Sequence, residues 1–391
     1  MSDKKPIYVL AGEPSGDNLG GRVMRALKSR AAAELDFAGV GGPRMAEEGL
    51  ESLIPLEELS VFGMAEILRH VPRLYRHIYR LAADIRARRP ALVLTIDNPA
   101  FNFGVAARAR VPGAAFVHLN APKVWAYRPG RVHRVARIFD HLLCLLPFEP
   151  PYFHRAGMPA SFIGHPVVES GAGAGDGAGF RRRHAIPADA PLLCLLPGSR
   201  AGEVARLLPV FVEAARLVAA RAPGLRLVLP TVGAMEAAVR VGVSGLNPAP
   251  IVVLDEAEKF DAFAASTAAL AASGTVSLEL AMARLPMVIA YRVSGLTAAI
   301  ARRLMRVEHI TIANLVLGRR VVPELTQENC TPVILAEAVA GLLADTKARA
   351  EQVRQTGEAM RQLGLGGPPP SLRAADILLD IAGIPRHLSR G

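Results

Sequence analysis

The sequence predicts an α/β protein of two domains, each built on a doubly wound parallel sheet. Short apolar runs alternate with amphipathic helical runs along the chain, which is the pattern of βαβ units. The alternation stops at residues 171–179, GAGAGDGAG, and then begins again. The length of 391 residues also exceeds that of an ordinary single domain. Two such domains favour a ligand cleft between them.

The composition and net charge limit the classes of binding partner that this chain is expected to have. It is 51% hydrophobic and 21% charged, which is the balance of a globular protein and not of a disordered one. The net charge of +11 favours anionic partners: nucleic acid, acidic phospholipid or phosphorylated substrates. Aromatic residues make up only 5% and no RGG-type tract occurs, which argues against single-stranded nucleic acid.

No segment of the sequence has the pattern of a signal peptide or of a membrane span. The apolar part of MSDKKPIYVLAG is too short for a signal peptide, and the longest uncharged run, residues 262–278, holds few large apolar residues. Cys144, Cys194 and Cys330 lie far apart, so we expect buried thiols and neither disulfides nor a metal site. These observations predict a cytosolic protein.

The first strand, residues 7–11, ends in the polar turn GEPSGD. A helical run follows, and residues 37–42 supply a second strand and a glycine turn. The turn is not a GxGxxG dinucleotide fingerprint. Because open α/β sheets bind ligands at the carboxyl ends of their strands, we expect Glu13, Ser15 and Asp17 to contact a polar substrate.

Residues 59–81, LSVFGMAEILRHVPRLYRHIYRL, interleave large apolar groups with Arg and His. One interpretation is a core-facing amphipathic helix with a solvated basic face. The other is a surface that dips into an anionic bilayer or receives acyl chains. Pro72 divides the pattern and is expected to start a second helix.

Another strand, residues 91–97, ends on Asp97. A carboxylate at the carboxyl end of a parallel strand faces the ligand crevice, where a general base belongs. The simpler alternative is that Asp97 caps the next turn.

Further along the chain, residues 122–137 concentrate Arg and Lys around Trp125. This segment could hold a phosphate or a lipid headgroup, or form an ordinary solvated helix face.

The second domain repeats the alternation of strand and helix patterns. Its strands are expected at residues 192–196, 226–229, 251–254, 268–272 and 286–291. After the first of these strands, Pro197-Gly198-Ser199 forms a turn and Arg200 to Glu203 opens a helix. Free backbone N–H groups, the helix dipole and the Arg200 guanidinium make an anion site there. The alternative is a plain tight connection. Ser273-Gly274-Thr275, with Glu279 one turn later, repeats the arrangement.

Several motifs occur together in a single order between residues 11 and 325. They are AGEPSGD, VGGPRM, LEELSVFGMAEIL, TIDNPAFN, VWAYRPGRV, LPFE, FIGHP, LPGSRAGEV, ASGTVSLE, MVIAYR and IANLVLGRRVVPEL. The chain resembles the lipid-A-disaccharide synthase family, whose members are inverting glycosyltransferases of the GT-B fold. The resemblance implies two Rossmann-like parallel-sheet domains facing a central cleft.

The resemblance also implies an activity. The family condenses UDP-2,3-diacylglucosamine with 2,3-diacylglucosamine 1-phosphate, makes a β-1,6-linked disaccharide and releases UDP, with no cofactor and no essential metal. The implied domains are acceptor binding at 1–170, a linker at 171–179, nucleotide-sugar binding at 180–363, and a helical segment, 364–391, that packs on an N-terminal domain.

The family's functional residues are carried over by matching motifs. Asp97 would be the general base. The expected UDP contacts are Gly198, Ser199, Arg200, Glu203, Ser273, Gly274, Thr275, Glu279 and Asn314. The expected acceptor or sugar contacts are Glu13, Ser15, Asp17, Asn98 and Arg128. The expected membrane or acyl contacts are Val61, Phe62, Met64, Ile67 and Leu68.

Three positions depart from the family pattern. Ala100 replaces a second acidic residue, which argues against a paired-carboxylate mechanism, and Lys123 and Tyr127 replace an expected Ser and Trp.

The acyl chains of both substrates favour peripheral association with an anionic membrane, at the cytoplasmic face of the bacterial inner membrane. The sequence does not decide whether the protein forms a homodimer. The rival interpretations are another UDP-GlcNAc-dependent GT-B transferase with a lipid-linked acceptor, a UDP-sugar epimerase, and a non-catalytic nucleotide or lipid-phosphate binder. A lipid-linked muramyl-peptide transferase should have a glycine-rich loop where GEPSGD stands.

Overall fold

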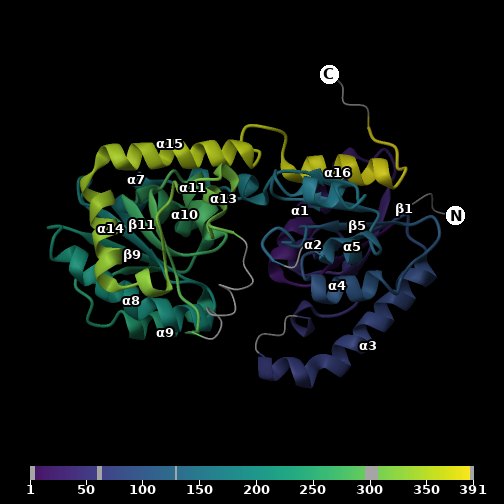
Figure 1. Ribbon diagram of the computed structural model, residues 1–391, viewed down its shortest axis with the longest axis horizontal. Helices are drawn as coiled ribbons and strands as arrows, with labels where there is room; N and C mark the ends of the chain where they lie inside the picture. The colour runs from purple at the N-terminus through teal and green to yellow at the C-terminus, as the bar shows by residue number, and fades with distance from the viewer. Residues whose placement is uncertain (1–4, 60–63, 128–129, 296–306, 388–391) are drawn as a thin grey trace. The chain divides into compact units, whose positions relative to one another are not determined.

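The computed structural model describes residues 5–59, 64–127, 130–295 and 307–387. The chain divides into two compact units (Figure 1). Unit 1 comprises Met1–Pro166 and Gly366–Gly391, and unit 2 comprises Val167–Leu365. Each unit is built on a parallel sheet, so the predicted fold class of two doubly wound α/β domains is confirmed.

The sheet of unit 1 has the strand order β3-β2-β1-β4-β5-β6-β7. Its strands are β1 (Lys5–Ala11), β2 (Leu35–Val40), β3 (Glu51–Ser52), β4 (Leu92–Ile96), β5 (Ala115–Leu119), β6 (His141–Cys144) and β7 (Ala160–Phe162). β1 and β4 are parallel neighbours, with Val9 opposite Leu94. The chain winds outward from this pair in both directions, so the switch point of the sheet lies between them.

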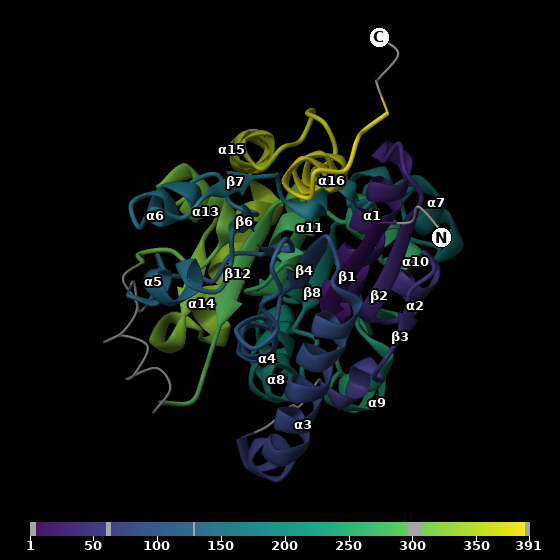
Figure 2. The ribbon, with the colours of Figure 1, turned by 90° about the vertical axis from the view of Figure 1, so that its right-hand side faces the viewer.

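Alternating side chains of β1 explain how unit 1 buries both faces of its sheet. Ile7 and Val9 pack in a cluster with α1 (Pro14–Arg30) and α16 (Pro370–Ile381). Tyr8 and Leu10 pack in another cluster with α3 (Met64–Arg88) and α4 (Pro99–Ala106). Figure 2 shows the two helix pairs on opposite sides of β1 and β4. Three shorter helices complete the unit: α2 (Pro43–Ala46), α5 (Arg131–Ala136) and α6 (Pro150–His154).

α16 belongs to unit 1 although it follows the whole of unit 2 in the sequence. Leu378 and Leu379 are fully buried in the cluster that holds α1. The Arg30 guanidinium donates two hydrogen bonds to the Asp376 carboxylate, at 2.8 and 2.9 Å. Apolar packing and this bidentate ion pair therefore fix the two helices to each other.

α3 is a single helix from Met64 to Arg88, with Pro72 in its interior. The prediction that Pro72 starts a second helix is wrong, because one helix runs through the proline without a break. Ile78, Leu81 and Ile85 are buried at helical spacing. No helix among the described residues combines the length and the apolar character that crossing a membrane requires.

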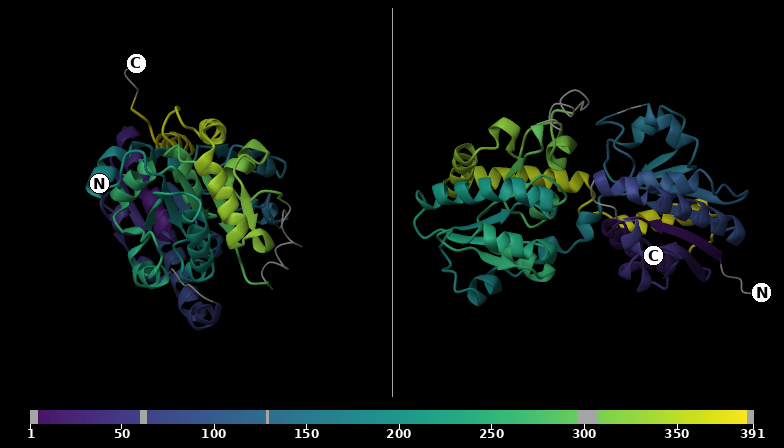
Figure 3. Two further views of the ribbon diagram at one scale, coloured as in Figure 1. Left: turned by 90° about the vertical axis from the view of Figure 1, so that its left-hand side faces the viewer. Right: turned by 90° about the horizontal axis from the view of Figure 1, so that it is seen from below.

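The sheet of unit 2 repeats the winding of the first, in the order β10-β9-β8-β11-β12-β13. Its strands are β8 (Leu192–Leu196), β9 (Arg226–Pro230), β10 (Ile251–Val253), β11 (Ala268–Ala272), β12 (Met287–Tyr291) and β13 (Glu324–Thr326). Its helices include α7 (Gly177–Arg183), α8 (Ala201–Ala219), α9 (Glu236–Gly242), α10 (Glu256–Ala265), α11 (Val276–Met282), α13 (Ile312–Leu317), α14 (Pro332–Ala344) and α15 (Thr346–Gln362). Helices cover both faces of this sheet (Figure 3, left).

The glycine-rich stretch 171–179 packs within unit 2 and is not the flexible linker that its composition suggested. A Cβ on Gly175 would lie 2.2 Å from the carbonyl oxygen of Phe260, on α10. The Asp176 side chain caps α7 by accepting a 2.8 Å hydrogen bond from the Gly179 N–H. The glycines permit close backbone approach, and the boundary between the units falls earlier, after Pro166.

Candidate functional site

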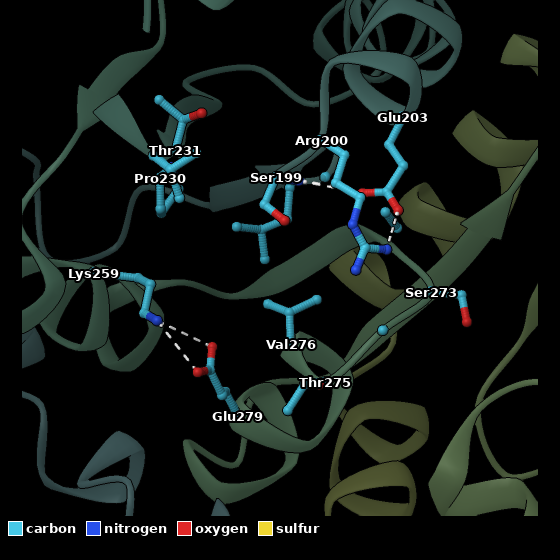
Figure 4. Close-up of a pocket in the computed structure, with 15 residues that line it drawn as sticks. Ser199, Arg200, Glu203, Pro230, Thr231, Lys259, Ser273, Thr275, Val276 and Glu279 are labelled. Carbon is cyan, nitrogen blue, oxygen red and sulfur yellow. Dashed lines mark hydrogen bonds and ion pairs between the residues drawn. The ribbon is translucent and has the colours of Figure 1, made fainter. Parts of the chain in front are cut away.

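A pocket in unit 2 lies at the switch point of the sheet, where β8 and its neighbour β11 end. Its volume is about 380 Å³, within the range of small-molecule sites. Figure 4 shows the side chains that line it. The lining residues are Leu196, Gly198, Ser199, Arg200, Glu203, Pro230, Thr231, Val232, Lys259, Ala272, Ser273, Gly274, Thr275, Val276 and Glu279. The structure thus brings together both turns that the sequence singled out.

Gly198 shapes the first of these turns. Its φ of +117° is unfavourable for residues with a side chain, and an added Cβ would lie 2.7 Å from the Cβ of Glu203. The turn brings the Ser199 N–H within 3.4 Å of the Glu203 carboxylate, to which it donates. A residue other than glycine would push the start of α8 away from the pocket.

α8 begins at the pocket with Arg200 as its N-cap residue. The first N–H groups of a helix lack partners within the helix, and the helix dipole adds positive charge there. The Arg200 side chain is 69% exposed and lies 3.5 Å from Glu203, so its guanidinium can turn toward a ligand. This end of α8 can bind a phosphate or diphosphate.

Lys259 is a pocket residue that the sequence analysis missed. It reaches the pocket from α10 and pairs with Glu279 at 3.2 Å (Figure 4). The signal available was a single lysine in the acidic run DEAEKFD, which does not by itself predict a site. The pair fixes the Glu279 carboxylate at the pocket wall, where it can accept hydrogen bonds from hydroxyl groups.

Thr231, at the end of β9, is a second missed residue. Its hydroxyl oxygen is buried and has no hydrogen-bond partner among the described residues. Buried polar atoms are normally hydrogen-bonded, so this hydroxyl is an exception in the wall of the pocket.

Asn314 is not a lining residue of this pocket, so its expected contact with UDP stays a prediction. Its side chain is fully buried and saturated with hydrogen bonds. The amide nitrogen donates to the Val322 carbonyl and the Glu324 carboxylate, each at 2.9 Å. The amide oxygen accepts from the N–H groups of Val321 and Val322. Asn314 therefore holds the chain between α13 and β13.

Asp97 stands at the corresponding switch point of unit 1, directly after β4. Its φ is +53°, and Asn120, directly after the neighbouring strand β5, has a φ of +74°. The Asn120 amide and the Ser15 hydroxyl both donate to the Asp97 carboxylate, Ser15 at 3.2 Å. Backbone strain of this kind concentrates at functional sites.

Burial raises the pKa of Asp97 above that of an ordinary aspartate. The hydrogen bonds from Asn120 and Ser15 and the positive charge of Lys123 oppose this shift. A carboxylate with a raised pKa is a better proton acceptor, which suits a general base. Asn120 was not predicted from the sequence, although FVHLN, like TID, is an apolar strand that ends on a polar residue.

The other predicted residues of unit 1 divide into three groups. Glu13 and Asn98 are half-buried, as the N-cap residues of α1 and α4. Asp17 has a structural role, and its expected sugar contact stays a prediction. Its buried carboxylate accepts hydrogen bonds from the N–H groups of Gly42, Arg44 and Met45, so it caps α2. Arg128, Val61, Phe62 and the side chains of Met64, Ile67 and Leu68 lie outside the described residues.

Comparison with known proteins identifies a family. The family model described as lipid-A-disaccharide synthetase matches residues 7–365. A lipid-A-disaccharide synthase from Rhodospirillum centenum is 52% identical over 377 residues, which cover 96% of this chain and 94% of the relative.

Solved structures with the same fold include two UDP-sugar or glycosyl-transfer proteins. UDP-GlcNAc 2-epimerase from Neisseria meningitidis, bound to UDP-GlcNAc, superposes with a TM-score of 0.62 at 10% identity, over 96% of this chain and 98% of that one. The glycotransferase of kitacinnamycin gives a TM-score of 0.64 at 17% identity, over 98% and 100%. At such low identity these likenesses establish the fold alone, as GT-B. The nearly full-length family match and the close relative establish more: this chain belongs to the lipid-A-disaccharide synthase family.

Proposed function

We propose that the protein condenses UDP-2,3-diacylglucosamine with 2,3-diacylglucosamine 1-phosphate, in an inverting transfer that forms a β-1,6 linkage and releases UDP. The observation that carries the proposal is the pocket at the ends of β8 and β11. Its turns and helix N-terminus suit the binding of a diphosphate, and the chain belongs to this family. The rival transferases and epimerases are not favoured, because the family match extends over residues 7–365.

The donor nucleotide is assigned to the pocket of unit 2. Gly198 and Ser199 bring the backbone close to the diphosphate, and Arg200 supplies a guanidinium fork for its oxygens. Glu279, held by Lys259, accepts hydrogen bonds from the ribose hydroxyls. As the bond from C1 to the diphosphate oxygen breaks, Arg200 and the N-terminus of α8 stabilise the negative charge that develops on UDP.

Asp97 is assigned the role of general base. The 6-hydroxyl of the acceptor attacks C1 of the donor sugar from the face opposite UDP, and its proton passes to the Asp97 carboxylate. Ser15 and Asn120 hold that carboxylate in place by donating hydrogen bonds to it. Ala100 offers no second carboxylate here, so a single base carries the proton transfer.

A membrane surface is the proposed source of both lipid substrates. The solvent-facing side of α3 carries Tyr75 and Tyr79, which are 51% and 57% exposed, together with Arg76 and Arg80. Tyrosines and arginines combine an apolar body with a polar tip, which suits the headgroup region of a bilayer. The net charge of +11 draws the chain to anionic lipid.

The experiment that tests the function is an assay with purified protein. We expect the diacylated UDP donor and the monophosphate acceptor, dispersed in neutral detergent, to yield UDP and a disaccharide 1-phosphate in equal amounts. UDP-GlcNAc, run in parallel with and without acceptor, should give neither transfer nor epimerisation. Absence of disaccharide under all conditions would reject the proposal, and UDP-ManNAc formed from UDP-GlcNAc alone would favour the epimerase instead.

A further inference from the structure

Unit 1 contains a second cavity, and one of its lining residues, Pro99, follows Asp97 by two positions. Its volume is about 290 Å³, and it is lined by Pro99, Ala100, Phe103, Pro122, Arg131, Arg134 and Val135. The residues that form the Asp97–Asn120 hydrogen bond are close in the chain to two of the cavity's lining residues. Pro99 follows Asp97 by two residues, and Pro122 follows Asn120 by two.

The lining of this cavity combines two arginines with an apolar wall. Arg131 and Arg134 come from α5, and the apolar side chains come from α4, α5 and the segment after β5. Both arginines are exposed, and no carboxylate among the described residues forms an ion pair with either of them. Arg131 stacks on the Tyr127 ring, with the guanidinium carbon 5.6 Å from the ring centroid.

Some other basic side chains of unit 1 are neutralised by nearby carboxylates. Arg25 and Lys28 both pair with Glu48, and Arg110 pairs with Asp140. Two guanidinium groups that share one cavity without a described carboxylate make a local excess of positive charge. Guanidinium forks match the oxygens of a phosphate group, and low-dielectric walls strengthen the attraction.

We infer that this cavity, the Arg131–Arg134 pocket, binds the phosphate monoester of the acceptor, with the apolar wall receiving the adjoining part of an acyl chain. The inference rests on the proposed function and deepens it. A single sugar ring separates the 6-hydroxyl of such an acceptor from its 1-phosphate. Because Pro99 and Ala100 line the pocket and follow Asp97 closely in the chain, we expect an acceptor that presents its hydroxyl to Asp97 to place its other end there.

The assignment makes Arg131 and Arg134 specificity-determining residues. They would discriminate an acceptor with a phosphate from the same diacylated sugar without one, and they would not affect the donor. The membrane is the other source of phosphate chemistry, because arginines also bind phospholipid headgroups. The test separates the two.

The test compares the two acceptors in neutral detergent micelles, with the ratio of their kcat/KM values as the readout. Wild type should prefer the phosphorylated acceptor, and Arg134→Gln and Arg131→Gln should each reduce this preference about ten- to a hundredfold, the usual effect of losing a charge-assisted hydrogen bond. The KM for the UDP donor should not change. Arg137→Gln is the matched control, since Arg137 is exposed at the end of the same helix but does not line the cavity.

The ratio compares two substrates on one variant, so partial loss of folded protein does not alter it. Where a glutamine variant does not fold, as judged by circular dichroism, Arg134→Lys replaces it. That variant keeps the charge but loses the fork, and an intermediate preference is expected. A wild-type preference in every folded variant would overturn the assignment.

A second measurement uses vesicles of phosphatidylcholine and phosphatidylglycerol. Sedimentation of Arg134→Gln with these vesicles should equal that of wild type. Reduced sedimentation with an unchanged acceptor preference would assign the arginines to lipid headgroups and overturn the proposal. Failure of the proposed function looks different, because wild type would then turn over neither acceptor. Equal turnover of both acceptors by wild type would reject this inference alone.

Discussion

At the scale of single residues, the ends of β4 and β5 show how the fold holds Asp97, the carboxylate that we propose as the general base. Asp97, Asn98 and Asn120 all have positive φ, a region in which Asp and Asn are less disfavoured than other residues with side chains. The fully buried Asn102 amide donates to the carbonyls of Ile96 and Asp97, at 2.9 and 2.8 Å, and so secures the strained backbone.

The role of Asp97 predicts the effect of Asp97→Asn. Turnover should fall about 10²- to 10⁴-fold, the usual contribution of a positioned general base. UDP affinity should be unchanged, because the nucleotide pocket is in unit 2. UDP release and calorimetric titration with UDP measure the two quantities, and Asp36→Asn, at an exposed position of β2, is the control. Near-normal turnover would exclude Asp97 as the base.

The environment of Asp97 also predicts a pH effect. The base works only when ionised, so kcat/KM falls as the pH drops through the pKa of Asp97. Asn120 stabilises the ionised form, and Asn120→Ala should therefore raise that pKa further. The acidic limb of the kcat/KM profile should move to higher pH. The loss of activity relative to wild type should therefore be smaller at alkaline pH than at acidic pH. A limb that stays in place would show that Asn120 does not tune the base.

Arg200 provides the corresponding test in the nucleotide pocket. Arg200→Gln should weaken UDP binding by about 1.5–3 kcal/mol, or roughly ten- to a hundredfold in Kd. Arg216→Gln, which removes an exposed arginine near the other end of α8, should leave the affinity unchanged. If both variants bind UDP like wild type, Arg200 does not contact the diphosphate.

At the scale of elements, local pattern predicted the central strands well. β8 and β11 have the predicted bounds, 192–196 and 268–272, because a fully buried parallel strand is a short apolar run, ended here by Pro197 and Ser273. The two turns of the nucleotide pocket follow from the same pattern, since they must lie at the carboxyl ends of those strands.

Interactions between residues far apart in the sequence account for what local pattern missed. Asp17 and Asn314 looked available for ligands, but their hydrogen-bond partners lie in other loops. Lys259 reaches the pocket only because α10 packs beside β8 and β9. Likewise, Pro72 and the stretch 171–179 were interpreted as breaks, whereas packing against neighbours keeps both within ordered elements.

The packing of the 171–179 stretch leads to a stability prediction. Gly175→Ala should destabilise unit 2 by about 1–3 kcal/mol, because the added Cβ would overlap the backbone of α10. Gly341→Ala, within α14 and with no atom near its added Cβ, should instead stabilise by about 0.5–1 kcal/mol. Trp125, the only tryptophan, reports on unit 1, so circular dichroism and tryptophan fluorescence together identify the transition of unit 2. Equal stability of Gly175→Ala and wild type would support a loose linker.

At the scale of the whole molecule, the excess of positive charge and the exposed face of α3 predict how the chain meets lipid. Replacing Tyr75 and Tyr79 by Ser should reduce sedimentation with anionic vesicles, since two amphipathic rings leave the interface. Raised salt should weaken binding of both proteins by screening. Tyr152→Ser is the control, at another exposed tyrosine of unit 1. Undiminished sedimentation of the double variant would place the membrane contact elsewhere.

The return of the chain to unit 1 has a consequence for biosynthesis. Unit 2 is one continuous stretch, so it can finish folding while the polypeptide is still being made. Unit 1 cannot, since the apolar surface around Ile7 and Val9 has only the α1 part of its cover until residues 370–381 emerge. A nascent chain therefore carries an unfinished, aggregation-prone domain throughout the synthesis of 199 intervening residues, Val167–Leu365. Chaperones that shield exposed apolar surface would act on this protein in that interval, and premature termination anywhere before α16 would leave unit 1 permanently incomplete.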